Sequence, residues 1–464
     1  MNRRVLRTEL RRSAAPWAGA VVLGGSLAVF LLYDGVWSRG TAGWTAQWTT
    51  MAMWTRSLLA FWLPLVVGIG AVYGLREPRS RMTELLTTTP LPAWRRAVLP
   101  AGALALALAV GFGLLTVVGG ARVALGPTTY TGLGWLPIPL VAVLGLVAAA
   151  VFAMGVARTL PSVLTPPALV VACLVTTNML RVRIEGVVPD SRTSNRLGLL
   201  SPVTAEPRQM LLTLSGSVHL GQSIWLLGLL ATGLALLAAT TRRARLLAVT
   251  PVLAGAAAAL LILPAAARDA YVIDKAAATL VCDGPVCVTE ASRSHLAELV
   301  PRSREALSVL HDVLGDRAPT SVREDTALRA LGDLRALPDD AVLVDFDEQL
   351  FADATGSDLT RALVAGGLAP SCHPRTPREG GGQDDAALQS IAVSWALGDP
   401  TLRPIEEKAT DEYSRRTWAA ADAAWQGLKE LAPAEQRAWI AELRTAALSC
   451  TARLRELPAG GAAR

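Results

Sequence analysis

The first 266 residues of this 464-residue sequence contain no lysine and only seven acidic residues, against 22 arginines, a net charge of +15. Residues 267–464 hold 22 basic and 31 acidic residues, a net charge of −9, and the two parts sum to the +6 of the whole chain. Charged residues make up only 18% of the sequence, too few to cover the surface of a soluble protein of this size. No soluble stretch interleaves aromatic and basic residues, so we expect no nucleic-acid partner.

The sequence also lacks the motifs of common hydrolases. No G-x-x-x-x-G-K-[ST] loop occurs, and none of Lys275, Lys408 and Lys429 follows a glycine, so the chain has no nucleotide-hydrolysing loop of its own. The four histidines form no H-E-x-x-H motif, and there is no G-x-S-x-G turn for a serine nucleophile. We therefore expect a non-catalytic chain without a cofactor or a metal.

Long apolar segments, by contrast, are abundant. A helix of roughly 20 apolar residues, with a working range of about 17–25, crosses a bilayer core of ~30 Å. Seven uncharged runs qualify: Trp17–Tyr33, Ser57–Leu75, Ala97–Gly119, Leu136–Ala157, Val163–Leu180, Ser223–Thr240 and Leu246–Ala267. Gly70 and Gly74 form a small-xxx-small pair, a pattern associated with close helix packing. The expected fold class is an α-helical polytopic membrane protein with about seven transmembrane helices in residues 1–267, followed by a mostly helical α+β domain in residues 268–464.

Arginine placement predicts how these spans are oriented, because cytoplasmic loops are enriched in Lys and Arg. With the N-terminus inside, 14 arginines of the first half fall in cytoplasmic segments and eight in outer ones. Five of those eight lie in one long connection, Arg181 to Gly221, which is the main departure from the rule. The N-terminal apolar run has no small-residue cleavage site, so we interpret it as an uncleaved span. An odd number of spans then places residues 268–464 outside the cytoplasm.

Four of the five cysteines lie in the predicted outer domain: Cys282, Cys287, Cys372 and Cys450. An even set in an extracytoplasmic segment favours disulfides, because such compartments are oxidising. "ATLVCDGPVCVTE" predicts a β-hairpin with Cys282 and Cys287 at its neck, which pairs them and leaves Cys372 with Cys450 by elimination. A zinc site built from these cysteines and His373 is the alternative.

Apolar residues at helical spacing predict three helices in the outer domain, within residues 292–315, 412–431 and 433–448, and a strand around Val342 to Phe346. The tryptophans 395, 418, 425 and 439 fall within or beside predicted helices, and we expect them in the core. Asp345, Asp347 and Glu348 could bind a cation, but a solvated strand end is the expected role of such residues.

A short basic segment, "REPRSRMTELLTTTPLPAWRRAVLP", separates the second and third apolar runs on the predicted cytoplasmic side. Its helical spacing places Met82, Leu85 and Leu86 on one face and Glu84 and the arginines on the other, and two prolines stop the helix. We expect Trp94 at the level of the lipid headgroups and Arg95 and Arg96 at the lipid phosphates. The segment is thus predicted to form a short helix along the inner leaflet, touching membrane lipids.

This segment resembles the coupling helix of ABC transporter permeases of the type-2 exporter class, in which a basic turn containing glutamate runs into a Thr/Pro stretch and then into arginines. "NRLGLLSPVTA" is similar to the outer-leaflet segment of the same class, and the resemblance covers about residues 1–245. It implies that a separate ABC ATP-binding subunit docks on the segment, and that a second permease copy or a paralogue completes the pathway. The implied coupling residues are Glu77, Arg79, Arg81, Met82, Glu84, Leu85, Leu86, Trp94, Arg95 and Arg96. The seventh span and the large outer domain depart from the pattern of the class.

Two functions are compatible with these observations. The first is a permease that exports a lipid-like, peptide or drug-like molecule with a separate ATPase. The second is a membrane-anchored binding or sensing protein whose outer domain recognises a ligand or an envelope partner. The predicted spans contain no acidic residue and no lysine, which argues against a proton- or ion-coupled carrier.

Overall fold

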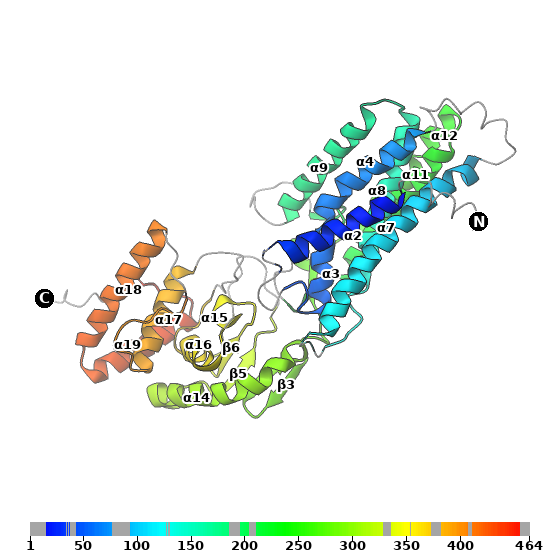
Figure 1. Cartoon of the computed structure of the whole chain (residues 1–464). Helices are drawn as coiled ribbons and strands as arrows, with labels where there is room; N and C mark the ends of the chain where they lie inside the picture. Colours follow the sequence, from blue (N-terminus) through cyan, green and yellow to red (C-terminus); the bar gives the residue numbers. More distant parts are fainter. Residues whose placement is uncertain are drawn as a thin grey trace.

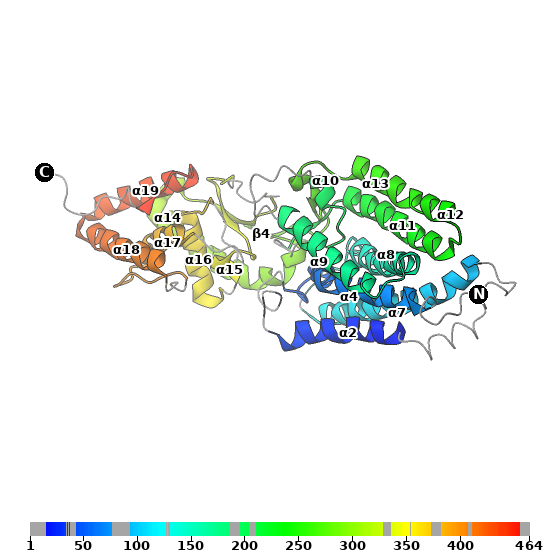
Figure 2. The ribbon, with the colours of Figure 1, turned by 90° about the horizontal axis from the view of Figure 1, so that it is seen from above.

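The computed structural model describes residues 15–454, apart from residues 34, 36, 38–42, 77–92, 127, 129, 185–194, 204–209, 328–335, 353, 373–381 and 407–410. Within these residues a bundle of apolar helices and a mixed α/β domain lie end to end (Figure 1). Figure 2 shows that the bundle is several helices wide, with α2 (Ala15–Leu32) and α13 (Thr250–Ile262) at opposite edges.

The long helices of the bundle correspond to the apolar runs of the sequence. Besides α2 and α13, its helices are α3 (Trp48–Ser57), α4 (Leu59–Gly74), α7 (Ala93–Ala124), α8 (Pro137–Thr159), α9 (Thr165–Ile184), α10 (Asn195–Gly198), α11 (Gly216–Ala238) and α12 (Arg242–Leu247). Five helices of the described residues are long and apolar enough to cross a membrane, or six if the bent pair α3–α4 counts as one span. The apolar stretch Thr165–Leu180 of α9 is shorter. The structure thus has the helical membrane architecture that the sequence predicts, with five or six full-length spans where about seven were expected.

The second span differs from its prediction at its beginning. The sequence predicts a start at Ser57, whereas α3 already begins at Trp48 and meets α4 at a bend of 46°. Nine of the ten residues of α3 are buried, so this polar stretch, which includes Arg56, lies inside the bundle. Hydropathy missed α3 because its threonines and arginine offset its methionines and tryptophans.

Glycines allow the membrane helices to approach one another at the backbone. A Cβ atom on Gly70 would lie 2.2 Å from the carbonyl oxygen of Ala150, and one on Gly74 would lie 2.2 Å from that of Met154. The small-xxx-small pair of α4 therefore packs directly on α8, as such pairs do in membrane helices. Gly19 of α2 meets the carbonyl oxygen of Ala107 in α7 in the same way.

These contacts also fix the directions of the helices. Gly70 faces Ala150 and Gly74 faces Met154, so α4 and α8 run in the same direction. On the other side of the bundle, Gly221 of α11 faces Leu263 and Gly228 faces Gly255, so α11 and α13 are antiparallel. Figure 1 shows the start of α2 and the α/β domain at opposite ends of the bundle. We call the end beside the α/β domain the near end and the opposite one the far end.

The C-terminal domain is built on a four-stranded sheet. Its strands, in spatial order, are β3 (Leu280–Asp283), β4 (Val286–Thr289), β5 (Ser321–Glu324) and β6 (Ala341–Val344). β3 and β4 form the predicted antiparallel hairpin, while β4, β5 and β6 are parallel. The main helices are α14 (Leu296–Leu314), α15 (Gln349–Ala352), α16 (Gly356–Leu368), α17 (Gln383–Ala396), α18 (Glu412–Glu430) and α19 (Pro433–Leu448). β6 is the strand that the sequence predicts around Val342.

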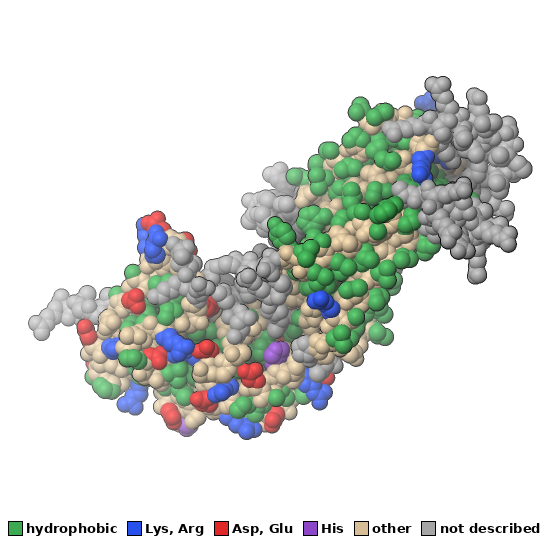
Figure 3. All heavy atoms as spheres, viewed as in Figure 1, with side chains coloured by type: hydrophobic (Ala, Val, Ile, Leu, Met, Phe, Trp, Pro, Cys, Tyr) green, Lys and Arg blue, Asp and Glu red, His purple; other side chains and the backbone are tan. Residues whose placement is uncertain are grey.

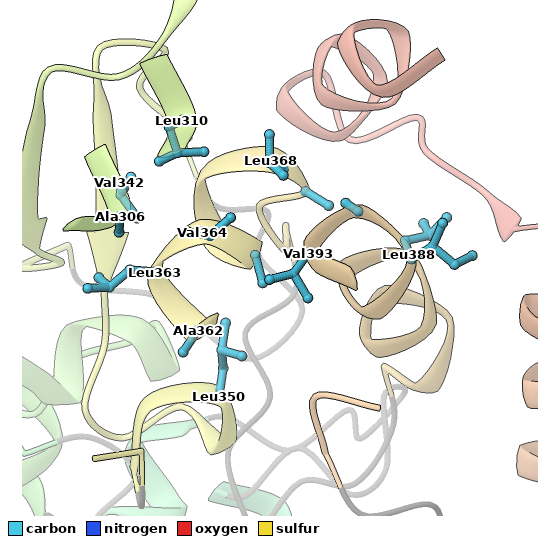
Figure 4. Packing of buried hydrophobic residues seen from close by; sticks show 14 of the residues in the cluster. Ala306, Leu310, Val342, Leu350, Ala362, Leu363, Val364, Leu368, Leu388 and Val393 are labelled. Carbon is cyan, nitrogen blue, oxygen red and sulfur yellow. The ribbon is translucent and has the colours of Figure 1, made fainter. Parts of the chain in front are cut away.

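The core of this domain lies between the sheet and the helices. Leu310 of α14, Val342 of β6 and Leu363 of α16 belong to one cluster, which Val393 of α17 extends (Figure 4). Trp418, Trp425 and Trp439 are buried in the same cluster, and Trp395 packs against it. The prediction that these tryptophans are core residues is confirmed.

Candidate functional site

Most of the predicted coupling residues lie outside the described part of the chain: Glu77, Arg79, Arg81, Met82, Glu84, Leu85 and Leu86. Trp94, Arg95 and Arg96 belong to the first turn of α7, where only the backbone is described. The described flanks are the end of α4, where the guanidinium of Arg76 lies 4.5 Å from the ring centre of Tyr73, and the start of α7 at Ala93. Both flanks lie at the far end of the bundle (Figure 1).

Other arginines gather at the same end. Arg158 lies in the last turn of α8, which runs parallel to α4. Arg242, Arg243 and Arg245 belong to α12, none of whose residues is buried. Thr241 caps this short helix by accepting a hydrogen bond from the backbone N–H of Ala244 at 3.2 Å. The far end is therefore basic around the place where the predicted docking segment leaves and rejoins the bundle.

The predicted disulfides are present in the structure. The sulfur atoms of Cys282 and Cys287 are 2.06 Å apart, and those of Cys372 and Cys450 are 2.00 Å apart. A sulfur in a disulfide is not a thiolate and cannot ligate zinc, so the zinc alternative loses its ligands. The described residues also contain no group of three or more His, Cys, Asp or Glu side chains arranged to hold a metal.

A second cluster of polar residues lies at the junction between the bundle and the C-terminal domain. β1 (Leu212–Leu214), just before α11, pairs with β2 (Tyr271–Ile273), just after α13, in an antiparallel ribbon. Beside this ribbon the hydroxyl of Tyr130 donates to the Asp274 carboxylate at 3.1 Å. Burial, and then the Asp274 charge, raise the pKa of Tyr130 to about 12, so this hydroxyl stays a donor at physiological pH.

Two further hydrogen bonds cross the junction. The side-chain amide of Gln47, the residue that precedes α3, donates to the carbonyl oxygen of Ala291 in the C-terminal domain at 2.8 Å. In the other direction, the carboxylate of Asp347 accepts the backbone N–H of Met210 at 2.5 Å. The bundle and the domain are thus joined by specific polar contacts from three separate parts of the chain.

Asp345 and Glu348 correct an expectation from the sequence. They are 9% and 1% exposed, so they do not form a solvated strand end. One oxygen of Asp345 accepts the backbone N–H of Asp347 at 2.9 Å, which shapes the turn that follows β6. These acidic residues serve the turn and the junction.

A small cavity opens between the carboxyl ends of the parallel strands and the ribbon. Its volume of about 20 Å³ is enough for one water molecule. The residues that line it come from both parts of the chain: Met210, Leu211, Ile273, Glu324, Asp325, Thr326, Ala327, Asp345, Phe346 and Asp347. In open α/β sheets this edge is the usual place for a ligand, but here the ribbon of the membrane part covers it.

Glu324 is the most unusual acid at this edge. It is 6% exposed, and its carboxylate accepts hydrogen bonds from the Thr289 backbone N–H at 2.7 Å and from the Ser292 hydroxyl at 2.8 Å. Burial raises the pKa of Glu324 to about 7; the hydrogen bonds lower it in part, and the nearby Asp345 raises it further. The charge of Glu324 therefore changes near neutral pH, and its partner Ser292 is the residue next to the junction contact at Ala291.

Arg56 is the charged residue buried most deeply in the bundle. Its side chain has no exposed surface; Nε donates to the Pro202 carbonyl at 2.9 Å and Nη2 donates to the Gln222 side chain. Gln222 in turn donates to the carbonyl oxygens of Leu199 and Ser201, both at 2.8 Å. Among the described residues Nη1 has no hydrogen-bond partner. These hydrogen bonds of Arg56 and Gln222, which we call the node, join the end of α3 to α11 and to the segment that leads into β1.

Sequence reasoning missed both the junction and the node. Arg56 lies just before an apolar run and Gln222 just before another, so each was assigned to a loop. A usable signal was the composition of residues 48–56, in which three threonines lie among methionines and tryptophans, as suits a buried helix of mixed polarity. Comparison of the chain with protein families, curated proteins and solved structures finds no match.

Proposed function

We propose that this chain is the membrane subunit of an ATP-driven exporter and that a separate ABC ATPase docks on residues 77–96 at the far end of the bundle. One observation carries the proposal: α4 and α7, which flank the segment, both reach the basic end of the bundle, opposite the C-terminal domain. A bilayer normal along the bundle would put this arginine-rich end in the cytoplasm. The C-terminal domain, with its two disulfides, would then be extracytoplasmic.

An external energy source fits the chemistry of the spans. The described helices of the bundle contain no acidic residue and no lysine. Arg56 is buried in α3, but a guanidinium does not lose its proton in proteins and cannot relay one, and His219 is confined to the first turn of α11. The described helices thus offer no carboxylate or lysine for proton-coupled transport, which favours a pathway moved by an ATPase.

The same proposal calls for a second copy or a paralogue of this chain beside α9. That helix packs mainly on α4, and Val171, Val175 and Met179 on its other face are more than half exposed. Thr176 and Asn178 are exposed between them. Polar side chains on an apolar helix face are typical of helix pairing in membranes. Lipid-like, peptide and drug-like molecules remain the proposed substrates.

Co-purification tests the proposal most directly. The chain would be extracted from membranes in mild detergent, and bound proteins would be assayed for ATP hydrolysis. Leu85→Asp places a charge in the predicted apolar face of the segment and is expected to lower ATPase recovery at least tenfold, because truncating or charging a buried anchor costs ~2 kcal/mol or more.

Ser80→Asp is the matched control, since it adds the same charge on the opposite face of the predicted helix. It should leave ATPase recovery close to that of the unchanged protein. Equal recovery with both variants and the unchanged protein would remove the docking assignment.

A binding or sensing role is the second candidate, favoured by the hydrogen bonds that join the C-terminal domain to the bundle. The two candidates differ in their partners. An ATPase gene beside this one, or ATPase activity in the purified material, supports the exporter; a kinase or protease partner supports the sensor.

A further inference from the structure

We propose that the bent pair α3–α4 transmits movement between the C-terminal domain and the far end of the bundle, with Leu58 as the hinge and the Arg56–Gln222 contact as the fixed point. This inference rests on the proposed function in one respect: the moving end of α4 acts on the ATPase-docking segment that follows it.

The near end of the bent pair is tied to the C-terminal domain. Gln47 is 7% exposed, and both polar groups of its side chain are used: the amide N–H donates to Ala291, and the amide oxygen accepts the Thr128 hydroxyl at 2.8 Å. The backbone N–H of Gln47 donates to Thr50 at 3.1 Å, which fixes the first turn of α3. A shift of Ala291 therefore displaces the start of α3, because no exposed or mobile side chain intervenes.

α3 transmits such a shift as one body. It is a continuous helix of ten residues with nine of them buried, and it packs against α7 and α8. Close-packed interiors transmit displacement instead of absorbing it. The shift therefore reaches the last turn of α3, which contains Arg56.

At that turn the node provides a fixed point and Leu58 provides the freedom. Arg56 is bonded to Pro202 and to Gln222, which belongs to the long helix α11. Leu58 lies between the two helices, as the C-cap of α3 and the N-cap of α4, and its side chain makes no capping hydrogen bond to α4. The 46° bend is thus a junction between two rigid helices, where a few dihedral angles can change without breaking either one.

The far part of the pair packs closely on α8. At Gly70 and Gly74 the backbone of α4 lies directly on that of α8, so a displacement of α4 acts on its neighbour without an intervening side chain. Packed helices move past each other by about 1–2 Å in such transitions. α4 then ends at the Tyr73–Arg76 contact, directly before the proposed docking segment.

Distances between spin labels on the purified full-length chain test this coupling without any ATPase. Labels at Arg76→Cys and Ser162→Cys, in a Cys173→Ser background with the two disulfides intact, report the end of α4 against the α8–α9 turn. A second pair, Ser162→Cys and Arg242→Cys, reports far-end helices outside the bent pair. Gln47→Ala, about 30 residues away in sequence, should shift the first distance by about 2 Å and leave the second unchanged.

Two further variants separate coupling from loosened packing. Thr128→Val removes one hydrogen bond of Gln47 but keeps its bond to Ala291, so the first distance should stay as it is. Gln222→Leu releases the fixed point, and in that background Gln47→Ala should cause no further shift. If Gln47→Ala gives an unfolded sample, Gln47→Met, which keeps the volume, replaces it.

The inference is overturned by a first distance that does not change with Gln47→Ala, by an equal change with Thr128→Val, or by the same shift with and without Gln222→Leu. If no ATPase docks on the chain but the first distance changes with Gln47→Ala as expected, only the proposed function is overturned. If an ATPase docks but the first distance does not change, only the proposed transmission is overturned.

Discussion

The two halves of this molecule are held together by different additions to a core of apolar side chains. In the membrane half, that core, with Trp54 and Phe112, is joined by contacts where side chains are missing, as at Gly19, Gly70 and Gly74. In the C-terminal half, a core of large side chains is reinforced by two disulfides and by charged pairs such as Arg361–Asp399. In lipid, apolar side chains gain no hydrophobic free energy from meeting one another, so close packing, at these sites of backbone on backbone, favours one arrangement of helices. In water, burial of apolar surface supplies that preference.

Figure 3 makes the same contrast visible on the surface. The bundle is covered by apolar side chains with few charges, whereas the C-terminal domain carries acidic and basic side chains side by side. The stability of the membrane half should thus depend on the backbone contacts at its glycines, and that of the C-terminal half on its disulfides and buried charged groups.

Removing the long disulfide should have the largest effect, and only on the C-terminal half. Cys372→Ser with Cys450→Ser opens a link of sequence separation 78, worth about 4–5 kcal/mol in the chain-entropy description. The pair Cys282→Ser with Cys287→Ser opens a separation of only 5 and should cost about 2 kcal/mol. Thermal unfolding followed by proteolysis of each half measures both. Equal losses for the two pairs would contradict the loop-length explanation.

Adding one methyl group to α4 should come next, and it should act on the membrane half. Gly70→Ala places a Cβ 2.2 Å from a backbone oxygen of α8, which cannot move away by itself, and should cost about 3 kcal/mol. Gly102→Ala in α7 meets nothing within 4 Å and should stabilise its helix by about 1 kcal/mol. The thermal stability of the detergent-solubilised chain should therefore move in opposite directions. A shared direction would mean that backbone contact does not set the stability of this half.

The stability of the C-terminal half should depend on pH through Glu324. Its pKa is raised to about 7 in the fold from an ordinary value of 4.5, so the native state holds the proton more tightly than the unfolded chain. The contribution of Glu324 to the free energy of unfolding is therefore greatest below pH 4.5 and is lost as the pH rises to 7, a change of up to about 3 kcal/mol. Glu324→Gln stays neutral and should flatten this dependence, as measured by urea unfolding at pH 5 and pH 8.

The smallest effect is expected from an exposed ion pair. Arg416 and Glu412 form an i,i+4 pair on α18 with side chains that are 76% and 69% exposed. Arg416→Ala should change the free energy of unfolding by less than about 0.5 kcal/mol. By contrast, Arg361→Ala removes a buried guanidinium from Asp399 and Ser394 and should cost several times as much in the same urea titration.

Much of the architecture follows from the sequence because it depends on strong local patterns. Uninterrupted apolar runs predicted α2, α7, α8 and α11, and the turn Asp283–Pro285 predicted the hairpin β3–β4. Helical spacing predicted α14, α18 and α19 and placed their tryptophans in the core. The cysteine pairs followed from the hairpin and from counting.

What the sequence did not show depends on contacts between distant residues. The burial of Asp345 comes from a ribbon that covers the sheet edge, and no residue near Asp345 in the sequence indicates that ribbon. The burial of Arg56 likewise depends on Pro202 and Gln222, which lie 146 and 166 residues further along the chain. Short strands such as β1 and β2 carry too few residues for a pattern.

The ribbon β1–β2 also sets an order of assembly during synthesis. β1 precedes α11 and β2 follows α13, so the two strands can pair only after both helices have been made and have folded back on each other. Until then the sheet edge of the C-terminal domain lacks its cover, and the contact of Asp347 with Met210, two residues before β1, has no ribbon to support it. Correct attachment of the C-terminal domain therefore requires that the helical hairpin α11–α13 has been inserted. In a chain whose α13 has failed to enter the membrane, the ribbon β1–β2 cannot form and the sheet edge stays uncovered.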